Sequence, residues 1–290
     1  MQVLKSGFEL LEGPVWDPEL GLMVADANKG GAYHIDRDGN VFTVFEHRRG
    51  IGGMVRHELG GLVISGRNIA YKGPATAGTA VLLGNDPAGG IVGFNDLTTD
   101  SRGRIYAGAL GFLPTETELA GVGGPQASAP LFLIDLDGST RQVHPDIKIT
   151  NGLGFSADGM KLFHADSGDR TVYVYDVAED GSLSARRPFA ITPEGLPDGV
   201  AVAADGSVWV AVAHAGQVQV FNADGTLARR LVFPLPMVTS LCFGGADMRD
   251  LFVVSGSDGT GRADAGSIFH VVSDVPGLPI APARVKLPQA

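Results

Sequence analysis

An internal repeat constrains the fold of this chain more than any other feature of its sequence. Each copy has a few apolar residues, a turn rich in Asp and Gly, and an alternating run of β-branched and aromatic residues. The six copies are GPVWDPELGLMVADA, GGMVRHELGGLVISGR, NDLTTDSRGRIYAGAL, NGLGFSADGMKLFHADS, DGVAVAADGSVWVAVAH and TSLCFGGADMRDLFVVSG. Aligned on a common position, they lie 40, 43, 56, 47 and 41 residues apart. A propeller blade of four strands needs about 40 to 50 residues, so the repeat predicts an all-β, six-bladed β-propeller as a single domain over residues 1–290.

Each copy is interpreted as the two inner strands of a blade, joined by a turn such as ADG, ELG or SRG. Two further strands follow, and no segment shows sustained helical periodicity. We expect the segment near Val3 and Leu4 to supply the outer strand of the sixth blade; the alternative is Ala283 to Leu287. Residues 111–130 form an unusually long Gly/Pro-rich connection within the third blade, as expected of a lid.

Composition excludes several classes of partner. The net charge is −10, and Lys and Arg do not cluster as a nucleic-acid surface requires. No segment approaches the roughly 20 apolar residues that span a bilayer, and no signal peptide is recognised. The one cysteine, Cys242, allows no internal disulfide. We therefore expect a soluble, cytoplasmic protein that binds a small molecule and neither nucleic acid nor membrane.

Oxygen-bearing side chains stand just before four of the six inner strands. They are Glu12, Asn95, Asn151 and Asp198. Because inner strands line the channel of a propeller, these side chains should converge at one mouth. Two carboxylates and two amides suit a hard cation, best Ca²⁺, with Mg²⁺, Mn²⁺ and Zn²⁺ left open.

These residues also have an alternative interpretation. Asn151 and Asp198 each precede Gly, where Asn and Asp are common in turns, and Glu12 could be a surface acid. An oxygen-bearing side chain recurs at the equivalent position of four of the six repeats, and this recurrence favours the metal site over the alternative.

The motifs EGPVWD, FNDLTTDSRGRIYAG, NGLGFSADGMKLFHADS, LPDGVAVAADGSVWVA and CFGG resemble the senescence-marker-protein/gluconolactonase family, which includes regucalcin. The resemblance spans nearly the whole chain. It implies a six-bladed propeller with a divalent metal held by Glu12, Asn151 and Asp198. It also implies that Asn95 sits beside the metal and contacts substrate or bound water.

The ends of the second strands should reach the same mouth. This adds Asn28, Arg67, Asn68, Phe112, Asp166, His214 and Ser255. Arg67, Phe112 and His214 are the candidates for substrate contact, together with Asn95. Arg67 could bind a carboxylate or merely pair with a neighbouring acid, and His214 could relay a proton or be structural.

Two departures from the family bear on the substrate. Sugar-lactone hydrolases of the family usually carry Arg two residues before the Asn of the ND motif, where this chain has Gly93. The charged sequence of the family's third-blade loop also has no counterpart in residues 111–130. The substrate is therefore expected to be less polyhydroxylated than gluconolactone.

Together these features predict a metal-dependent hydrolase that opens a lactone or related ester. Asp198 is the candidate general base, with direct nucleophilic attack by Asp198 as a variant. The alternatives are a non-catalytic metal-binding or interaction propeller, and a metal-dependent phosphotriesterase or isomerase.

Overall fold

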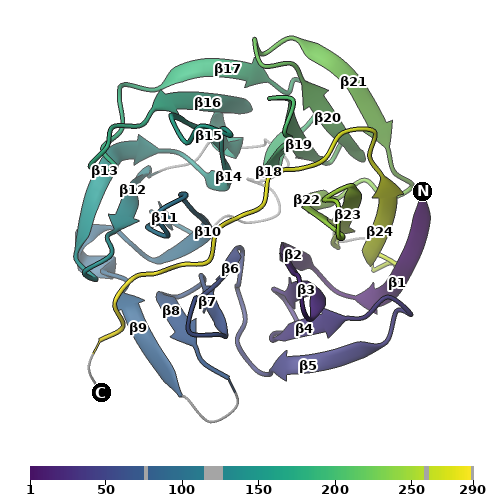
Figure 1. Cartoon of the computed structure of the whole chain (residues 1–290), viewed down its shortest axis with the longest axis horizontal. Coiled ribbons are helices and arrows are strands. Elements are labelled where there is room, and N and C mark those ends of the chain that lie inside the picture. Colours follow the sequence, from purple (N-terminus) through teal and green to yellow (C-terminus); the bar gives the residue numbers. More distant parts are fainter. Residues whose placement is uncertain (75–77, 114–126, 258–260, 289–290) are drawn as a thin grey trace.

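The computed structural model of the chain describes residues 1–74, 78–113, 127–257 and 261–288. Strands in these residues form six antiparallel sheets of four strands each. Figure 1 shows the sheets as blades around a central axis, which confirms the predicted six-bladed β-propeller. The turns between the two inner strands of each blade coincide with the Asp/Gly-rich turns of the repeat.

Each sheet begins with its innermost strand at the axis and ends with its outermost strand at the rim. The first sheet contains β2 (Leu11–Asp17), β3 (Gly21–Asp26), β4 (Ala32–Ile35) and β5 (Val41–Phe45). The second contains β6 (Met54–Arg56), β7 (Leu62–Ile64), β8 (Ile69–Lys72) and β9 (Thr79–Leu83). The third contains β10 (Gly93–Thr99), β11 (Ile105–Leu110), β12 (Ala129–Ile134) and β13 (Thr140–Ile147). The fourth sheet contains β14 (Thr150–Phe155), β15 (Lys161–Asp166), β16 (Thr171–Asp176) and β17 (Arg187–Ile191). The fifth contains β18 (Leu196–Val202), β19 (Val208–Ala213), β20 (Gln217–Phe221) and β21 (Leu227–Val232). The sixth contains β22 (Val238–Gly244), β23 (Asp250–Ser255), β24 (Gly266–Val272) and β1 (Gln2–Phe8). In the part of the chain that the structure describes, two 3₁₀ helices, η1 (Pro87–Gly89) and η2 (Ser167–Asp169), lie in connections.

The N-terminal strand closes the ring. β1 pairs antiparallel with β24, from Gln2 opposite His270 to Phe8 opposite Gly266. The sixth sheet thus joins the N-terminal strand to the last three strands of the chain, as predicted, and the alternative closure by residues 283–287 is wrong.

Large apolar side chains fill the space between neighbouring blades. Trp209 of β19 is buried and packs edge-on against Phe243 of β22, with ring centroids 5.2 Å apart. Trp16 of β2 stacks on Phe252 of β23 at 5.5 Å. Each such pair spans two sheets, so the blades stabilise one another through burial rather than through backbone pairing.

The C-terminal segment after β24 crosses one face of the ring (Figure 1). Leu278 donates its backbone N–H to Val202, Ala283 donates to Arg56, and Arg284 donates to Gly103. These acceptors belong to three different blades, and they lie at or near the turns that join the two inner strands. The segment therefore ties blades together at the end of the channel opposite the predicted mouth.

Removing residues 277–290 should lower the free energy of unfolding by about 3 kcal/mol or more. Ala283 and Val285 are almost fully buried, and burying one Val is worth about 1.5–3 kcal/mol, with about 1 kcal/mol for each lost hydrogen bond. Thermal unfolding should show a melting temperature lower by about 6 °C or more. The control is Ile280→Ser, because Ile280 is 43% exposed and its change should have little effect. An unchanged melting temperature in the truncated chain would contradict this role.

Candidate functional site

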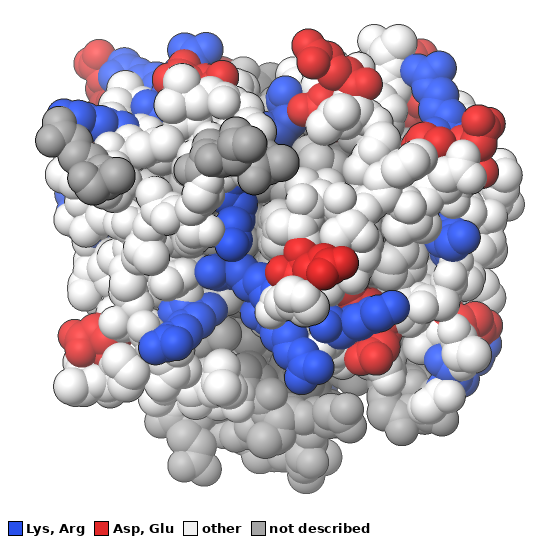
Figure 2. Space-filling view, turned by 90° about the horizontal axis from the view of Figure 1, so that it is seen from below, with Lys and Arg blue, Asp and Glu red and all other residues white. Residues whose placement is uncertain are grey.

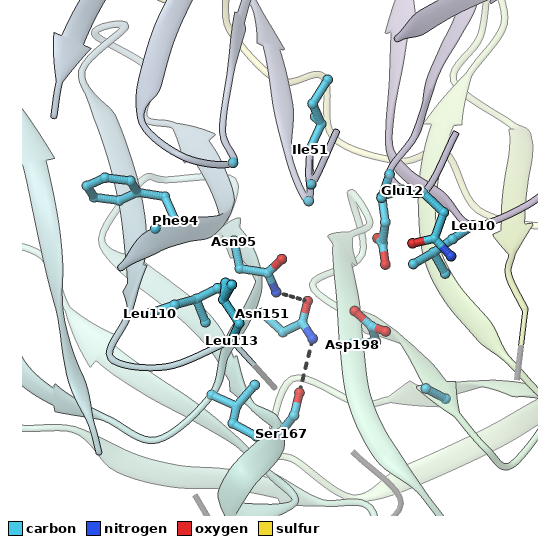
Figure 3. A pocket seen from close by; sticks show the side chains of 18 of the residues that line it. Leu10, Glu12, Ile51, Phe94, Asn95, Leu110, Leu113, Asn151, Ser167 and Asp198 are labelled. Atoms are coloured by element: carbon cyan, nitrogen blue, oxygen red, sulfur yellow. Dashed lines mark hydrogen bonds between the residues drawn. The ribbon is translucent and has the colours of Figure 1, made fainter. Parts of the chain in front are cut away.

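Glu12, Asn95, Asn151 and Asp198 lie on the inner strands β2, β10, β14 and β18. Figure 3 shows their side chains directed toward a common space at one mouth of the channel. The structure thus brings together all four residues that the repeat alignment singled out.

A backbone irregularity accompanies each of these residues. The pairing register shifts between Glu12 and Val15 in β2 and between Thr150 and Leu153 in β14. Equivalent shifts occur in β10 and β18. An extra residue in one strand breaks the ordinary alternation and redirects a side chain. Asn151 and Asp198 therefore lie within strands, and their interpretation as turn residues is wrong.

Glycine follows Glu12, Asn151 and Asp198 because neighbouring inner strands approach closely there. Gly13 has φ of +51°, and a Cβ at this position would lie 3.0 Å from the backbone nitrogen of Met54 in the next blade. A Cβ on Gly152 would lie 2.2 Å from the backbone nitrogen of Val200. A side chain at either position would force the strands apart and spread the candidate ligands.

The site concentrates negative charge. Burial raises the pKa of Glu12 well above its usual range, and the charges of Asp198 and Asp96 raise it further. Burial also raises the pKa of Asp198, with a second contribution from Asp96. The pKa of Asp96 is raised to about 7 by burial. None of these three carboxylates has a Lys or Arg among the described groups that shift its pKa.

This arrangement suits a bound cation. Asp198 is 6% exposed, and its Oδ1 is buried without a hydrogen-bond partner among the described residues. A buried carboxylate oxygen without a partner costs free energy that a cation would recover. The described residues contain no group of three or more His, Cys, Asp or Glu arranged to hold a metal, so an ion bound here would also need the amide oxygens of the site.

Hydrogen bonds fix the two amides. Asn95 donates its Nδ2 to the carbonyl of Thr150 at 2.9 Å and to Oδ1 of Asn151 at 3.2 Å. Asn151 in turn donates its Nδ2 to Ser167 (Figure 3). The hydroxyl of Ser167 donates to the carbonyl of Pro197. Both amide nitrogens are used as donors, so the Oδ1 of Asn95 is left as an acceptor or ligand. The Oδ1 of Asn151 already accepts one hydrogen bond from Asn95 and keeps a second lone pair for a ligand.

Buried polar residues at the ends of second strands hold the loops that lead into the inner strands. Asp26 accepts the backbone N–H of Leu10, and Asp166 accepts that of Ile149. Asp166 therefore supports the strand that carries Asn151 and is not among the described residues of the cavity wall. Sequence reasoning placed it at the mouth; its complete burial shows a structural role.

A cavity of about 560 Å³ opens above the four candidate ligands. Its wall is largely apolar: Leu10, Ile51, Val92, Phe94, Leu110, Leu113, Ile149, Leu196, Ala213 and Met237. Arg67 and His214 also line it, as expected, and so does Asn28. Phe112 is not among the described residues of the wall, where Leu113 takes its place. The predicted lid falls mostly on residues 114–126, outside the described residues.

Comparison with known proteins identifies the family. The family model described as "SMP-30/Gluconolactonase/LRE-like region" matches residues 10–257. The chain belongs to this family. Pentonolactonase XacC from Haloferax volcanii is a relative that is 32% identical, over 99% of this chain and 98% of its own length. A 6-deoxy-6-sulfogluconolactonase from Pseudomonas putida is 30% identical, over 95% of both chains.

Two solved structures superimpose on nearly the whole chain. A luciferin-regenerating enzyme superimposes with a TM-score of 0.83 at 23% identity, over 97% of both chains. A calcium-binding protein, regucalcin, from Agrobacterium tumefaciens superimposes with a TM-score of 0.82 at 20% identity, over 97% of this chain and 96% of its own. At sequence identities of 23% and 20%, these superpositions support the propeller fold of this chain. In the described residues, no helix has the length and apolar character needed to cross a membrane.

Two residues near the site were not singled out from the sequence. Asp96 follows Asn95 directly, and strand alternation would turn it away from the channel. The register shift between Phe94 and Leu97 removes that alternation, and the carboxylate lies close enough to influence Glu12 and Asp198. Ser167 was missed because its contact with Asn151 joins a loop to a strand. The sequence offered one signal for Asp96, namely its place directly after Asn95 in the ND dipeptide.

Proposed function

We propose that this chain is a divalent-metal-dependent lactonase, with Ca²⁺ as the ion. The supporting observation is the convergence of Glu12, Asn151 and Asp198 at the cavity floor, with no cationic side chain among the described groups to balance the two carboxylates. Oxygen ligands of this kind favour a hard cation. Relatives named pentonolactonase and 6-deoxy-6-sulfogluconolactonase support a lactone substrate, and the calcium-binding regucalcin of the same fold supports calcium.

In this proposal Glu12, Asn151 and Asp198 would hold the ion, and Asn95 would contact substrate or bound water. A bound divalent ion would polarise the lactone carbonyl and stabilise the negative charge that develops on its oxygen. Asp198 accepts a proton from the water molecule that attacks the carbonyl carbon. The same carboxyl group returns the proton to the ring oxygen as the C–O bond breaks, which yields the hydroxy acid. Asn95 orients the water through its free Oδ1, since its Nδ2 is held by Thr150 and Asn151.

The cavity wall supports a substrate that is less polyhydroxylated than gluconolactone. Gly93 lines the cavity where the family's sugar lactonases usually carry Arg, and apolar residues such as Leu110 and Leu113 surround it. An apolar wall offers few hydrogen-bond partners to sugar hydroxyls, whereas it accepts alkyl and aryl groups of varied shape. We also place Arg67 and His214 in contact with substrate.

A lactone panel tests this proposal. We expect alkyl or aryl lactones to give kcat/KM at least about tenfold higher than gluconolactone of similar ring size, because a well-formed hydrophobic contact contributes about 1–3 kcal/mol. Each rate is measured by pH-stat and corrected for spontaneous hydrolysis, with and without a chelator. A preference for gluconolactone would restore a sugar substrate. Hydrolysis that persists after chelation would remove the metal from the mechanism, and no hydrolysis at all would favour a non-catalytic binding propeller.

A further inference from the structure

Among the described residues that line the cavity there is one arginine and no lysine. Arg67 lies in the turn after β7, lines the cavity and is exposed. It forms no ion pair or hydrogen bond with any described residue, so its guanidinium is available to a ligand. An arginine with five unused donors next to a cavity is suited to a carboxylate, sulfonate or phosphate group.

A second arginine holds the turn that carries Arg67. The Arg48 guanidinium donates to the carbonyl of Ser65 at 2.9 Å, and to the carbonyl and the side-chain oxygen of Asn68 at 2.6 and 2.8 Å. These residues flank Arg67 on both sides. Gly66, between them, exchanges backbone hydrogen bonds with Phe94 in the next blade. The turn is thus fixed at several points, which lowers the entropic cost of using Arg67 for binding.

Most Lys and Arg side chains of the later blades are held in ion pairs, whereas those of the first two blades mostly are not. Between residues 102 and 284, every Lys and Arg except Arg170 is paired with an Asp or Glu of the described chain. At the mouth, Lys29 and Arg49 join Arg67 in having no acidic partner among the described residues. They flank the cavity-lining residues Asn28 and Gly50. Figure 2 views the side of the ring where β5 and β9 lie in Figure 1, and Lys and Arg gather along its centre with some Asp and Glu among them.

We infer that Arg67 forms an anion subsite at the mouth, and that the lactone substrate carries an acidic group such as a carboxylate or sulfonate. This inference rests on the proposed lactonase function and names its substrate class. Arg67 supplies the charge-assisted contact, and Arg48 is a positioning residue behind it. Lys29 and Arg49 add a local positive potential that offsets the net charge of −10 for an approaching anion. The acidic group binds at the wall while the lactone ring lies over the carboxylates of the floor.

The test compares two lactones that differ only in charge. One is a γ-lactone with a carboxylate on the ring carbon next to the ring oxygen, and the other is its neutral carboxamide. We expect the calcium-loaded wild type to prefer the acid about tenfold in kcat/KM. Arg67→Gln should reduce this ratio to about one, whereas Arg67→Lys should keep part of it because the charge is retained. Raising the salt concentration to about 0.5 M should lower the wild-type ratio, since exposed charges are screened.

Arg37→Gln is the matched control. Arg37 is exposed and unpaired among the described residues, but it lies in the turn between β4 and β5, away from the mouth. Arg37→Gln changes the net charge by the same amount as Arg67→Gln, and it should leave the acid-to-carboxamide ratio of kcat/KM unchanged. Equal rates for both lactones in wild type, or a preference for the acid that survives Arg67→Gln, would overturn the inference. If no lactone is hydrolysed, the proposed function fails separately, and calorimetric binding of the same acid and carboxamide to wild type and Arg67→Gln decides the subsite.

Discussion

Asp198→Asn should reduce kcat for lactone hydrolysis at least about a thousandfold. The change removes the proposed general base, which is worth about 10²–10⁴-fold, and also a negatively charged side chain from the proposed ligand set. Asn has nearly the shape of Asp, so the packing of β18 against β14 and β22 should be kept. Initial rates at saturating lactone, with the ion content of each sample measured, give the comparison.

Asn95→Ala is the paired variant for this experiment. Asn95 touches the same space and holds Asn151, but it carries no charge and cannot accept a proton from water. Its loss should lower kcat less than Asp198→Asn when both variants are saturated with the ion. Equal residual activity in the two variants would place the base elsewhere in the cavity.

The repeat was sufficient to predict the fold and the candidate site because both depend on periodic features. Six copies of one strand–turn–strand pattern fix six blades, and the position before the inner strand fixes which side chains meet at the axis. Glu12 and Asp198 are 186 residues apart in the sequence, yet equivalent places in two repeats bring them to one cavity floor. This inference needs only the symmetry of the propeller.

Features that break the periodicity could not be predicted in the same way. Asp96 comes close enough to influence Glu12 and Asp198 at a register shift that has no clear sequence pattern. The choice between Phe112 and Leu113 at the cavity wall depends on how the chain bends after β11, beyond the last regular position. The clamp of Arg48 on the turn around Arg67 links two loops of different blades, and side-chain contacts of this kind follow from the three-dimensional arrangement alone.

Removing the ion should lower the melting temperature by about 5–10 °C at pH 8 and by much less at pH 5.5. A ligand at a hundred times its Kd stabilises a fold by about 2.7 kcal/mol, and the unfolded chain cannot assemble residues so far apart. The pH dependence follows from the carboxylates. In the ion-free fold the pKa values of Glu12 and Asp198 are raised and that of Asp96 is about 7, whereas unfolded carboxyls titrate near 4. Between these values the folded state binds more protons, so its stability falls as the pH rises.

The measurement uses protein freed of ions on a chelating resin and unfolded thermally at several pH values, with and without added Ca²⁺. At pH 8 the three carboxylates repel one another without an ion, so added Ca²⁺ should raise the melting temperature strongly. At pH 5.5 protons already neutralise part of this charge, and the effect of Ca²⁺ should shrink. Asp96→Asn is the matched variant: it should raise the melting temperature of the ion-free protein at pH 8 and flatten its pH dependence, because one of the repelling charges is gone. A melting temperature independent of Ca²⁺ at every pH would show that these carboxylates do not hold an ion.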